Sequence, residues 1–388
     1  MSKEIVKSYP TKALFIDVLT RDLDLQACIM DLLDNSIDSY KRHEISTRQE
    51  IKITLSDDKF EIYDSCGGIE KEIFLNKAFI FGAEEATRDK KTIGLFGIGM
   101  KRAIFKIGKN IEIQSDDGQY LNTLLIDVEK WKADKINWDF EAASELSKDG
   151  TERGFTRIKI VDLNEITKIT FTSNSFIEKL KDQIHIMYTI FIKDHVDIYI
   201  NEIKIIPFDL EITFDDNYKP ARYKAIFDDV LVDIICGIEP HKGRTTKETG
   251  RRGWNVFIND RLILSDDTSS TTGWDALKGL LPNYHPIYNE FRGLVFLSSE
   301  DPFKLPLNTS KNGLNTESKV YHYVLKNMVN TARPVVNHLS RKYNEQKTLS
   351  DNIEYSILSQ PVEITKKVDL NSLPSENIQF IAPIVYIN

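Results

Sequence analysis

The sequence predicts an α+β fold in more than one domain, from its length and from two patterns near its start. The chain has 388 residues, and at roughly 150 residues per domain this length accommodates two or three domains. Apolar residues recur at helical spacing between residues 12 and 40, with charges on the opposite face. Between residues 51 and 63 they alternate on either side of the Asp57-Asp58 turn, which predicts a β-hairpin.

The remaining elements follow from the same periodicities. A helix is expected near residues 71–79, and strand patterns return at 110–113, 121–128 and 156–161. A further helix, several strands and a long helix over about residues 316–344 follow, and Pro334 is expected to kink or divide that helix. We therefore expect a first domain over residues 1–168, a second over 169–346 and an extended tail over 347–388.

Composition and charge exclude several classes of protein. The net charge of −8 argues against a chain that coats nucleic acid over its whole surface. The three cysteines form no C-x-x-C pair, so neither a disulfide framework nor a zinc site is indicated. Residues 1–10 lack the apolar core of a signal peptide, and no run approaches the roughly 18–20 apolar residues of a membrane span. We expect a cytoplasmic protein without a membrane segment.

The first cluster of chemical interest is D-L-L-D-N-S-I-D, from Asp31 to Asp38, on the first long helix. Asp31 and Asn35 are four residues apart, so their side chains lie on one face of that helix. A carboxylate and a carboxamide oxygen suit a hard cation with a water beside it. Taken alone, the cluster is better explained as a solvated acidic helix face.

The second cluster is Y-D-S-C-G-G-I, which follows the predicted hairpin. Asp64 leaves a strand into the Gly67-Gly68 pair, where its carboxylate can accept a hydrogen bond from an amino group such as that of adenine. The glycines allow the backbone to approach a flat ring closely. Taken alone, this cluster is typical of an ordinary turn.

The third cluster is G-L-F-G-I-G-M-K, from Gly94 to Lys101, and it opens an apolar helix. Glycines at a helix N-terminus expose backbone N–H groups to an anion, and the helix dipole adds attraction. Lys101 supplies a point charge for phosphate. The spacing is not G-x-G-x-x-G, and no glycine-lysine-serine/threonine sequence closes a Walker loop.

In order and spacing, the three clusters resemble the N box and two glycine boxes of the GHKL superfamily, which includes gyrase B, heat-shock chaperone ATPases, histidine kinases and MutL. The resemblance covers about the first 160 residues. The stretches Ser8–Lys12 and Ile80–Glu85, with Lys101, resemble the Microrchidia-like branch most closely. The resemblance implies a Bergerat-fold two-layer α/β sandwich, followed by a transducer-type (ribosomal S5-like) α/β domain.

The resemblance also implies ATP and Mg²⁺ as ligands, with a role for each motif residue. Asn35 would hold Mg²⁺ against the phosphates, and Asp64 would bind the adenine amino group with Thr156 beside it through a water. Asp31 stands where the family has its general base, and residues 81–91 would form a lid over ATP. The residues expected to contact ATP are Asn35, Asp38, Asp64, Gly68, Ile69, Phe81, Gly94, Leu95, Phe96, Gly97, Ile98, Gly99, Met100, Lys101 and Thr156.

Two positions depart from the family pattern. The family's base is usually glutamate, whereas Asp31 is shorter by one methylene, or about 1.5 Å. A positioned general base is worth roughly 10²–10⁴ in rate, so a displaced one predicts a slow ATPase or a module that only binds ATP. Cys66 stands where the family often has glycine, which is expected to alter the purine pocket slightly.

The segment from Lys304 to Gly313 resembles a loop of the heat-shock chaperones that carries a basic side chain to the γ-phosphate. Lys311 occupies the basic position and is the second catalytic candidate. A cation delivered from another domain ties domain orientation to the presence of the third phosphate. Taken alone, the loop is equally typical of an exposed turn.

The resemblance implies an ATP-dependent homodimer, formed through the N-terminal segment, that controls a protein partner. A histidine kinase is disfavoured, because no helix with a phosphoacceptor histidine precedes Asp31. A non-hydrolysing ATP sensor and a chaperone-like client binder stay as alternatives.

A glycine-containing loop carries a cluster of basic residues that would contact the phosphates of nucleic acid. The alternative is that the loop is only a solvated surface loop. The basic residues are Lys242, Arg244, Lys247, Arg251 and Arg252.

Overall fold

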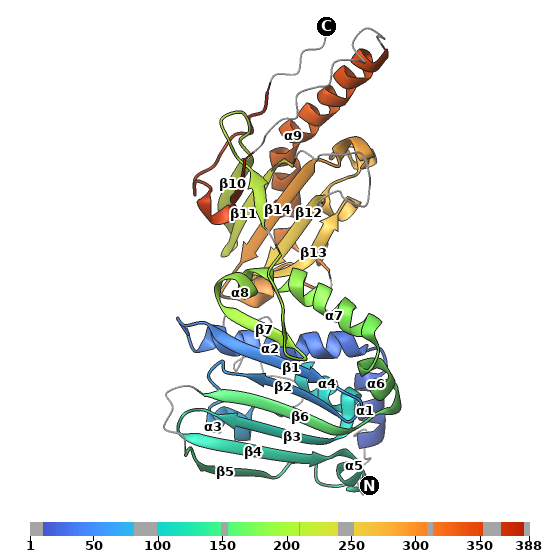
Figure 1. Cartoon of the computed structure of the whole chain (residues 1–388), viewed down its shortest axis with the longest axis vertical. Helices are drawn as coiled ribbons and strands as arrows, with labels where there is room; N and C mark the ends of the chain where they lie inside the picture. Colours follow the sequence, from blue (N-terminus) through green and yellow to red (C-terminus); the bar gives the residue numbers. More distant parts are fainter. Residues whose placement is uncertain are drawn as a thin grey trace, which may run out of the picture. The chain divides into compact units, whose positions relative to one another are not determined.

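A computed structural model describes residues 11–80, 99–148, 154–208, 210–239, 252–308, 313–351 and 366–383 (Figure 1). The chain divides into two compact units, residues 1–207 and residues 208–388.

Unit 1 is built on an eight-stranded sheet with the strand order β5-β4-β3-β6-β2-β1-β7-β8. Neighbouring strands are antiparallel except for β1 and β7, which are parallel. The strands are β1 (Gln49–Leu55), β2 (Lys59–Asp64), β3 (Gly108–Asp116), β4 (Tyr120–Asp127), β5 (Ala142–Leu146), β6 (Phe155–Leu163), β7 (Val196–Ile200) and β8 (Ile203–Lys204).

Helices α1, α2 and α4 lie on one face of this sheet (Figure 1). The helices of unit 1 among the described residues are α1 (Lys12–Thr20), α2 (Leu25–Arg42), α3 (Lys71–Asn76), α4 (Gly99–Ile107), α5 (Val128–Ala133), α6 (Glu165–Phe171), α7 (Asn174–Met187) and α8 (Thr189–Asp194). Along β1 every second residue is buried, because Ile51, Ile53 and Leu55 face the helices. The predicted hairpin is confirmed as β1 and β2.

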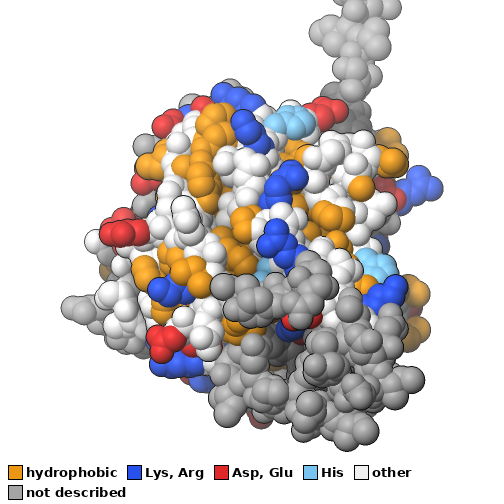
Figure 2. Space-filling model, turned by 90° about the horizontal axis from the view of Figure 1, so that it is seen from above, with side chains coloured by type: hydrophobic (Ala, Val, Ile, Leu, Met, Phe, Trp, Pro, Cys, Tyr) orange, Lys and Arg blue, Asp and Glu red, His pale blue; other side chains and the backbone are white. Residues whose placement is uncertain are grey.

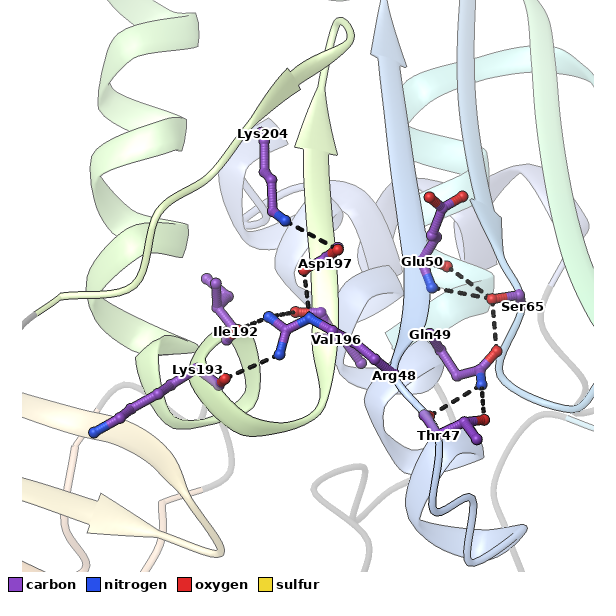
Figure 3. Close-up of polar contacts among 10 residues, drawn as sticks. All are labelled: Thr47, Arg48, Gln49, Glu50, Ser65, Ile192, Lys193, Val196, Asp197 and Lys204. Atoms are coloured by element: carbon purple, nitrogen blue, oxygen red, sulfur yellow. Dashed lines mark hydrogen bonds and ion pairs between the residues drawn. The ribbon is translucent and has the colours of Figure 1, made fainter. Parts of the chain in front are cut away.

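Arg48 fixes the start of the parallel pair β1 and β7 (Figure 3). Its guanidinium donates to Asp197 at 2.5 Å, and to the carbonyls of Lys193 at 2.9 Å and Val196 at 3.1 Å. It also donates to the carbonyl of Ile192, so two of the carbonyls in the last turn of α8 accept hydrogen bonds from Arg48. One side chain therefore joins β1 to the end of α8 and to β7.

The division between the units falls after Pro207, whereas we expected a boundary after residue 168. Helices α7 and α8 and strands β7 and β8 belong to unit 1. The physical reason is that Val196, Ile198 and Ile200 of β7 are fully buried in the same core as the residues of β1. The alternation that we placed in a second domain completes the first sheet.

Unit 2 contains a five-stranded sheet with the order β10-β11-β14-β12-β13, in which only the β12–β14 pair is parallel. The strands of unit 2 among the described residues are β9 (Glu211–Thr213), β10 (Ala221–Phe227), β11 (Val230–Ile238), β12 (Gly253–Ile258), β13 (Arg261–Asp267), β14 (Phe291–Ser298) and β15 (Lys367–Asp369), of which β9 and β15 form a separate two-stranded sheet. Short 3₁₀ turns are η2 (Ser270–Thr272), η3 (Ala276–Lys278), η4 (Pro286–Tyr288), η5 (Pro302–Lys304) and η7 (Leu370–Ser372).

The long helix α9 (Lys319–Asp351) packs against β10, β11 and β14. Val320, Val324 and Met328 are among its buried residues. Pro334 lies inside α9 and does not divide it. The helix also extends past residue 344, where we expected it to end.

The described part of the expected tail is packed onto unit 2. Strand β15 pairs with β9, and further along the chain Ile378 and Ile381 exchange backbone hydrogen bonds with Arg222 and Lys219. These contacts satisfy backbone groups at the edge of unit 2. Residues 366–383 are therefore part of the folded unit.

Candidate functional site

Three consecutive polar residues of α2 point in three directions. Asp34 is fully buried and accepts a hydrogen bond from the Tyr188 hydroxyl at 2.6 Å. Ser36 is buried and donates to Asp64 at 2.7 Å. Asn35, between them, is exposed. Because α2 is anchored on both sides of Asn35, its carboxamide is held outward at a fixed place, and an amide oxygen is a ligand that Mg²⁺ accepts.

Asp64 ends β2 and is only 4% exposed. Its Oδ2 accepts the hydrogen bond from Ser36, and its Oδ1 accepts one from the backbone N–H of Cys66 at 3.0 Å. The register of β2 and β6 places Asp64 directly opposite Thr156. An ionised carboxylate has about four lone-pair sites, so Asp64 retains the capacity to accept a hydrogen bond from an amino group.

Burial raises the pKa of Asp64 to about 6, and hydrogen bonds from Ser36 and from the backbone of Cys66 act in the opposite direction. The side chain is therefore mostly ionised at neutral pH. Relative to the ordinary pKa of 3.8, this shift corresponds to about 3 kcal/mol, at about 1.4 kcal/mol for each pH unit. The fold carries a buried negative charge at a cost to its stability.

The Gly67-Gly68 turn after Asp64 is packed against backbone. Gly68 has a φ of +72°, and a Cβ added there would lie 1.9 Å from the carbonyl oxygen of Asp116. Gly67 donates its N–H to the carbonyl of Gly154 at 3.1 Å. At Gly68 both the backbone conformation and the lack of space require glycine.

A row of hydroxyl groups continues from this turn across the sheet. The N–H of Ile69 donates to Ser115 Oγ at 2.7 Å, and Ser115 Oγ lies 3.2 Å from Thr156 Oγ1. On the other side, Ser39 of α2 donates to the carbonyl of Cys66 at 3.0 Å. The turn is therefore bonded both to α2 and to β3, which lies beyond β6 in the sheet.

Asp31 lies at the contact between α2 and α4. It is 7% exposed, and Arg102 donates to its Oδ2 through Nη2 at 2.8 Å and Nε at 3.1 Å. A Cβ added to Gly99 would lie 3.1 Å from Asp31 Cγ. The first turn of α4 is thus packed directly on the Asp31 carboxylate.

Lys101 and Asp38 are both buried, at 4% exposure each, and Met100 is half-buried. Burial lowers the pKa of Lys101 to about 8. The ammonium group therefore stays mostly protonated at neutral pH.

Several expected site residues lie outside the described residues, so the structure gives no contacts for them. They are Phe81, Gly94, Leu95, Phe96, Gly97, Ile98 and Lys311, together with the rest of the expected lid over residues 81–91. The basic residues Lys242, Lys247, Arg244 and Arg251 lie outside as well. Arg252 is described, and it donates to Asn289 Oδ1 at 3.2 Å.

Figure 2 shows lysine and arginine side chains interspersed with hydrophobic ones on the face that it presents.

Within the described part of the chain, no helix combines the length and apolar character that a membrane crossing requires.

Four side chains that organise this site were not predicted from the sequence: Ser36, Arg102, Ser115 and Tyr188. Ser36 could have been noticed, because it directly follows Asn35 in a helix whose other face is apolar. Arg102 pairs with a residue 71 positions earlier, and Tyr188 with one 154 positions earlier. Sequence periodicity carries no signal for such pairs.

Residues 23–156 match a family model described as histidine kinase-, DNA gyrase B-, and HSP90-like ATPase. The matched segment is about a third of the chain and contains Asp31, Asn35, Asp64 and Thr156. The match supports the GHKL resemblance and ATP binding by this segment, and the mixed α/β structure of unit 1 is consistent with it. A comparison with curated proteins finds no match.

We expect Gly68→Ala to destabilise the protein more than Gly118→Ala. Both glycines have positive φ, but nothing lies within 4 Å of a Cβ on Gly118. Backbone strain alone should cost about 1–2 kcal/mol at residue 118, whereas the clash at residue 68 should add about 1–3 kcal/mol. The midpoints of urea unfolding measure both effects. Equal losses would show that the contact between Gly68 and Asp116 is absent.

The stability difference between Asp64→Asn and the parent protein should depend on pH. The folded-state pKa of Asp64 is raised to about 6, so its contribution is fully present below about pH 4 and is lost as pH rises through about 6. The Asn variant has no such loss and should gain about 3 kcal/mol relative to the parent between pH 4 and pH 8. Chemical unfolding at a series of pH values measures this gain. A difference that does not change with pH contradicts the buried, ionised carboxylate.

Proposed function

We propose that unit 1 binds ATP with Mg²⁺ and hydrolyses it slowly, and that the nucleotide state drives lid closure and dimerisation to control a partner. The observation that carries the proposal is the buried Asp64, held by Ser36 and the backbone of Cys66 opposite Thr156. A buried charge that costs stability is typical of a functional group. Its hydrogen-bonding capacity suits the amino group of adenine.

Each of the other motif residues has a role in this proposal. Asn35 would hold Mg²⁺, which neutralises phosphate charge when bound. Backbone N–H groups at the start of α4, with Lys101, would hold the phosphates. Asp31 would accept a proton from the water that attacks the γ-phosphorus, as the bond from that phosphorus to the bridging oxygen breaks and ADP leaves.

Unit 2 would act as the transducer-type (ribosomal S5-like) domain, with Lys311 as the sensor of the γ-phosphate. This assignment is supported by the family resemblance of the loop from Lys304 to Gly313 and by the mixed sheet packed against α9. We place the protein closest to the Microrchidia-like branch on the sequence stretches that resemble it.

A second candidate is an ATP sensor that does not hydrolyse its ligand. The observation that favours it concerns Asp31. Its side chain is one methylene shorter than the glutamate usual at this position in the family, and it is only 7% exposed. A general base must come within hydrogen-bond reach of the water that it activates. A carboxylate that does not reach this water would leave binding intact and remove turnover.

Calorimetric titration with ATP in the presence of Mg²⁺ tests the binding site. The parent protein should bind ATP, and Asp64→Asn should bind it about 10–100-fold more weakly, because a hydrogen bond to a charged group contributes about 1.5–3 kcal/mol. Asp24→Asn is a matched control, since Asp24 caps α2 and asparagine caps helices equally well. Affinity lost equally in both variants, or retained in Asp64→Asn, would rule out the proposed role of Asp64.

Phosphate release under saturating ATP tests Asp31. Asp31→Asn should retain ATP affinity and lose roughly 10²–10⁴ in turnover, the range for a general base. Unchanged turnover in this variant would end the catalytic assignment. Tight binding without turnover in the parent would favour the ATP sensor.

A further inference from the structure

Arg102 contacts Asp31, the proposed general base, and has no role of its own in the proposed function. Two N–H groups of its guanidinium, Nε and Nη2, donate to one oxygen of Asp31, Oδ2, at 3.1 and 2.8 Å. The side chains of Asp31 and Arg102 are 8% and 25% exposed. The pair is therefore shielded from solvent, and it is stronger and geometrically more specific than an exposed ion pair.

A second contact restrains the same carboxylate. The backbone of Gly99 lies against Asp31, because a Cβ on Gly99 would approach Asp31 Cγ to 3.1 Å. Gly99 and Arg102 are three residues apart in α4, so they lie on one face of that helix. Asp31 is thus held by the first turn of α4 at two points, one steric and one electrostatic.

This arrangement bears on the length of the Asp31 side chain. Aspartate has one methylene fewer than glutamate, so its carboxylate reaches about 1.5 Å less far from the helix. A short base cannot compensate for a poor rotamer by extending, and a misplacement of about 1 Å is enough to reduce a rate by about 100-fold. The Arg102 guanidinium donates two hydrogen bonds to Asp31 Oδ2, and these bonds restrict the rotamer of the Asp31 side chain. They thereby also set the direction in which Oδ1 points.

We infer that Arg102 is a positioning residue for Asp31: it holds the carboxylate in the orientation from which Asp31 acts as general base. The inference rests on the proposed function. Because Arg102 belongs to the helix that the glycine cluster opens, the same helix would hold the phosphates and the base. The position of the base would then follow the position of the phosphates.

The test compares turnover and affinity in full-length protein, with ATP and Mg²⁺ as the probe. Arg102→Gln should lower kcat by at least about 10-fold and change KM and the calorimetric Kd for ATP by less than about threefold, since only the transition state needs the oriented base. Arg102→Lys keeps the charge and loses the fork, so its kcat should lie between those of the Gln variant and the parent.

Lys106→Gln is the matched control. Lys106 lies one turn further along α4 and donates to the carbonyl of Thr20 in α1 at 2.9 Å. It therefore braces the same helix without contacting Asp31. Its loss should leave kcat within about twofold of the parent. A fall in kcat equal to that of Arg102→Gln would show that α4 needs bracing only, and would overturn the inference.

Removal of Arg102 leaves a buried carboxylate without this partner, which is destabilising. If Arg102→Gln loses ATP binding, the comparison is made in the Asp31→Asn background, where no charge remains to be balanced. The double variant should then turn over ATP at the rate of Asp31→Asn alone. A further fall overturns the inference.

Two other outcomes also overturn it: a kcat unchanged or raised in Arg102→Gln, and an Arg102→Lys variant no faster than Arg102→Gln. A parent protein that binds ATP without hydrolysing it removes the role of Arg102 while leaving ATP binding intact. A parent without measurable affinity for ATP removes the proposed function itself.

Discussion

The hydrogen bond from Ser36 to Asp64 is the interaction on which the rest of the site depends. It joins α2 to the end of β2 at 2.7 Å, and so brings together the helix that carries Asn35 and the strand that carries the purine-binding candidate. It also offsets part of the cost of burying the Asp64 charge, since a hydrogen bond to an ionised group is stronger than one between neutral groups. Without it, Asp64 would retain only the backbone donor of Cys66 among the hydrogen bonds described above.

Helix α2 carries the first motif and contacts residues of the other two. Its Asp31 contacts the first turn of α4, and its Ser36 and Ser39 bond to Asp64 and to the carbonyl of Cys66. On the opposite side Asp34 is held by Tyr188, which lies at the junction of α7 and α8. A shift of α2 would therefore alter its contacts with the glycine turn, with α4 and with the α7–α8 junction. This gives a physical basis for coupling a bound nucleotide to the rest of unit 1.

Local patterns predicted the parts of this structure that depend on short sequence separations. The β1–β2 hairpin, the strands β3, β4 and β6, and the α2 helix follow from periodicity in the sequence. The place of β7 does not, because its residues pair in parallel with β1 residues 147 positions earlier in the chain (Val196 with Gln49), and its alternation would suit either domain. The pairing of β15 with β9 was missed for a different reason, because prolines nearby favoured an irregular tail.

The candidate site shows the same division. Asp64 and its glycine turn could be identified because turn chemistry is local, and the family pattern gave the residues around them their expected roles. The partners that hold those residues, Arg102, Tyr188 and Ser115, come from elements distant in sequence. A charge or a hydroxyl in such a position has no periodicity that distinguishes it from a surface residue. Only the folded geometry shows which side chains meet.

A comparison of ATP with inosine triphosphate, which carries a carbonyl oxygen in place of the amino group, tests directly whether Asp64 recognises the adenine amino group. Calorimetric titration of the full-length protein with each nucleotide and Mg²⁺ measures the two affinities under the same conditions. The inosine nucleotide should bind at least about 100-fold more weakly, because its carbonyl would face the Asp64 carboxylate without a hydrogen to share. Equal affinities would contradict the claim that Asp64 recognises a purine amino group.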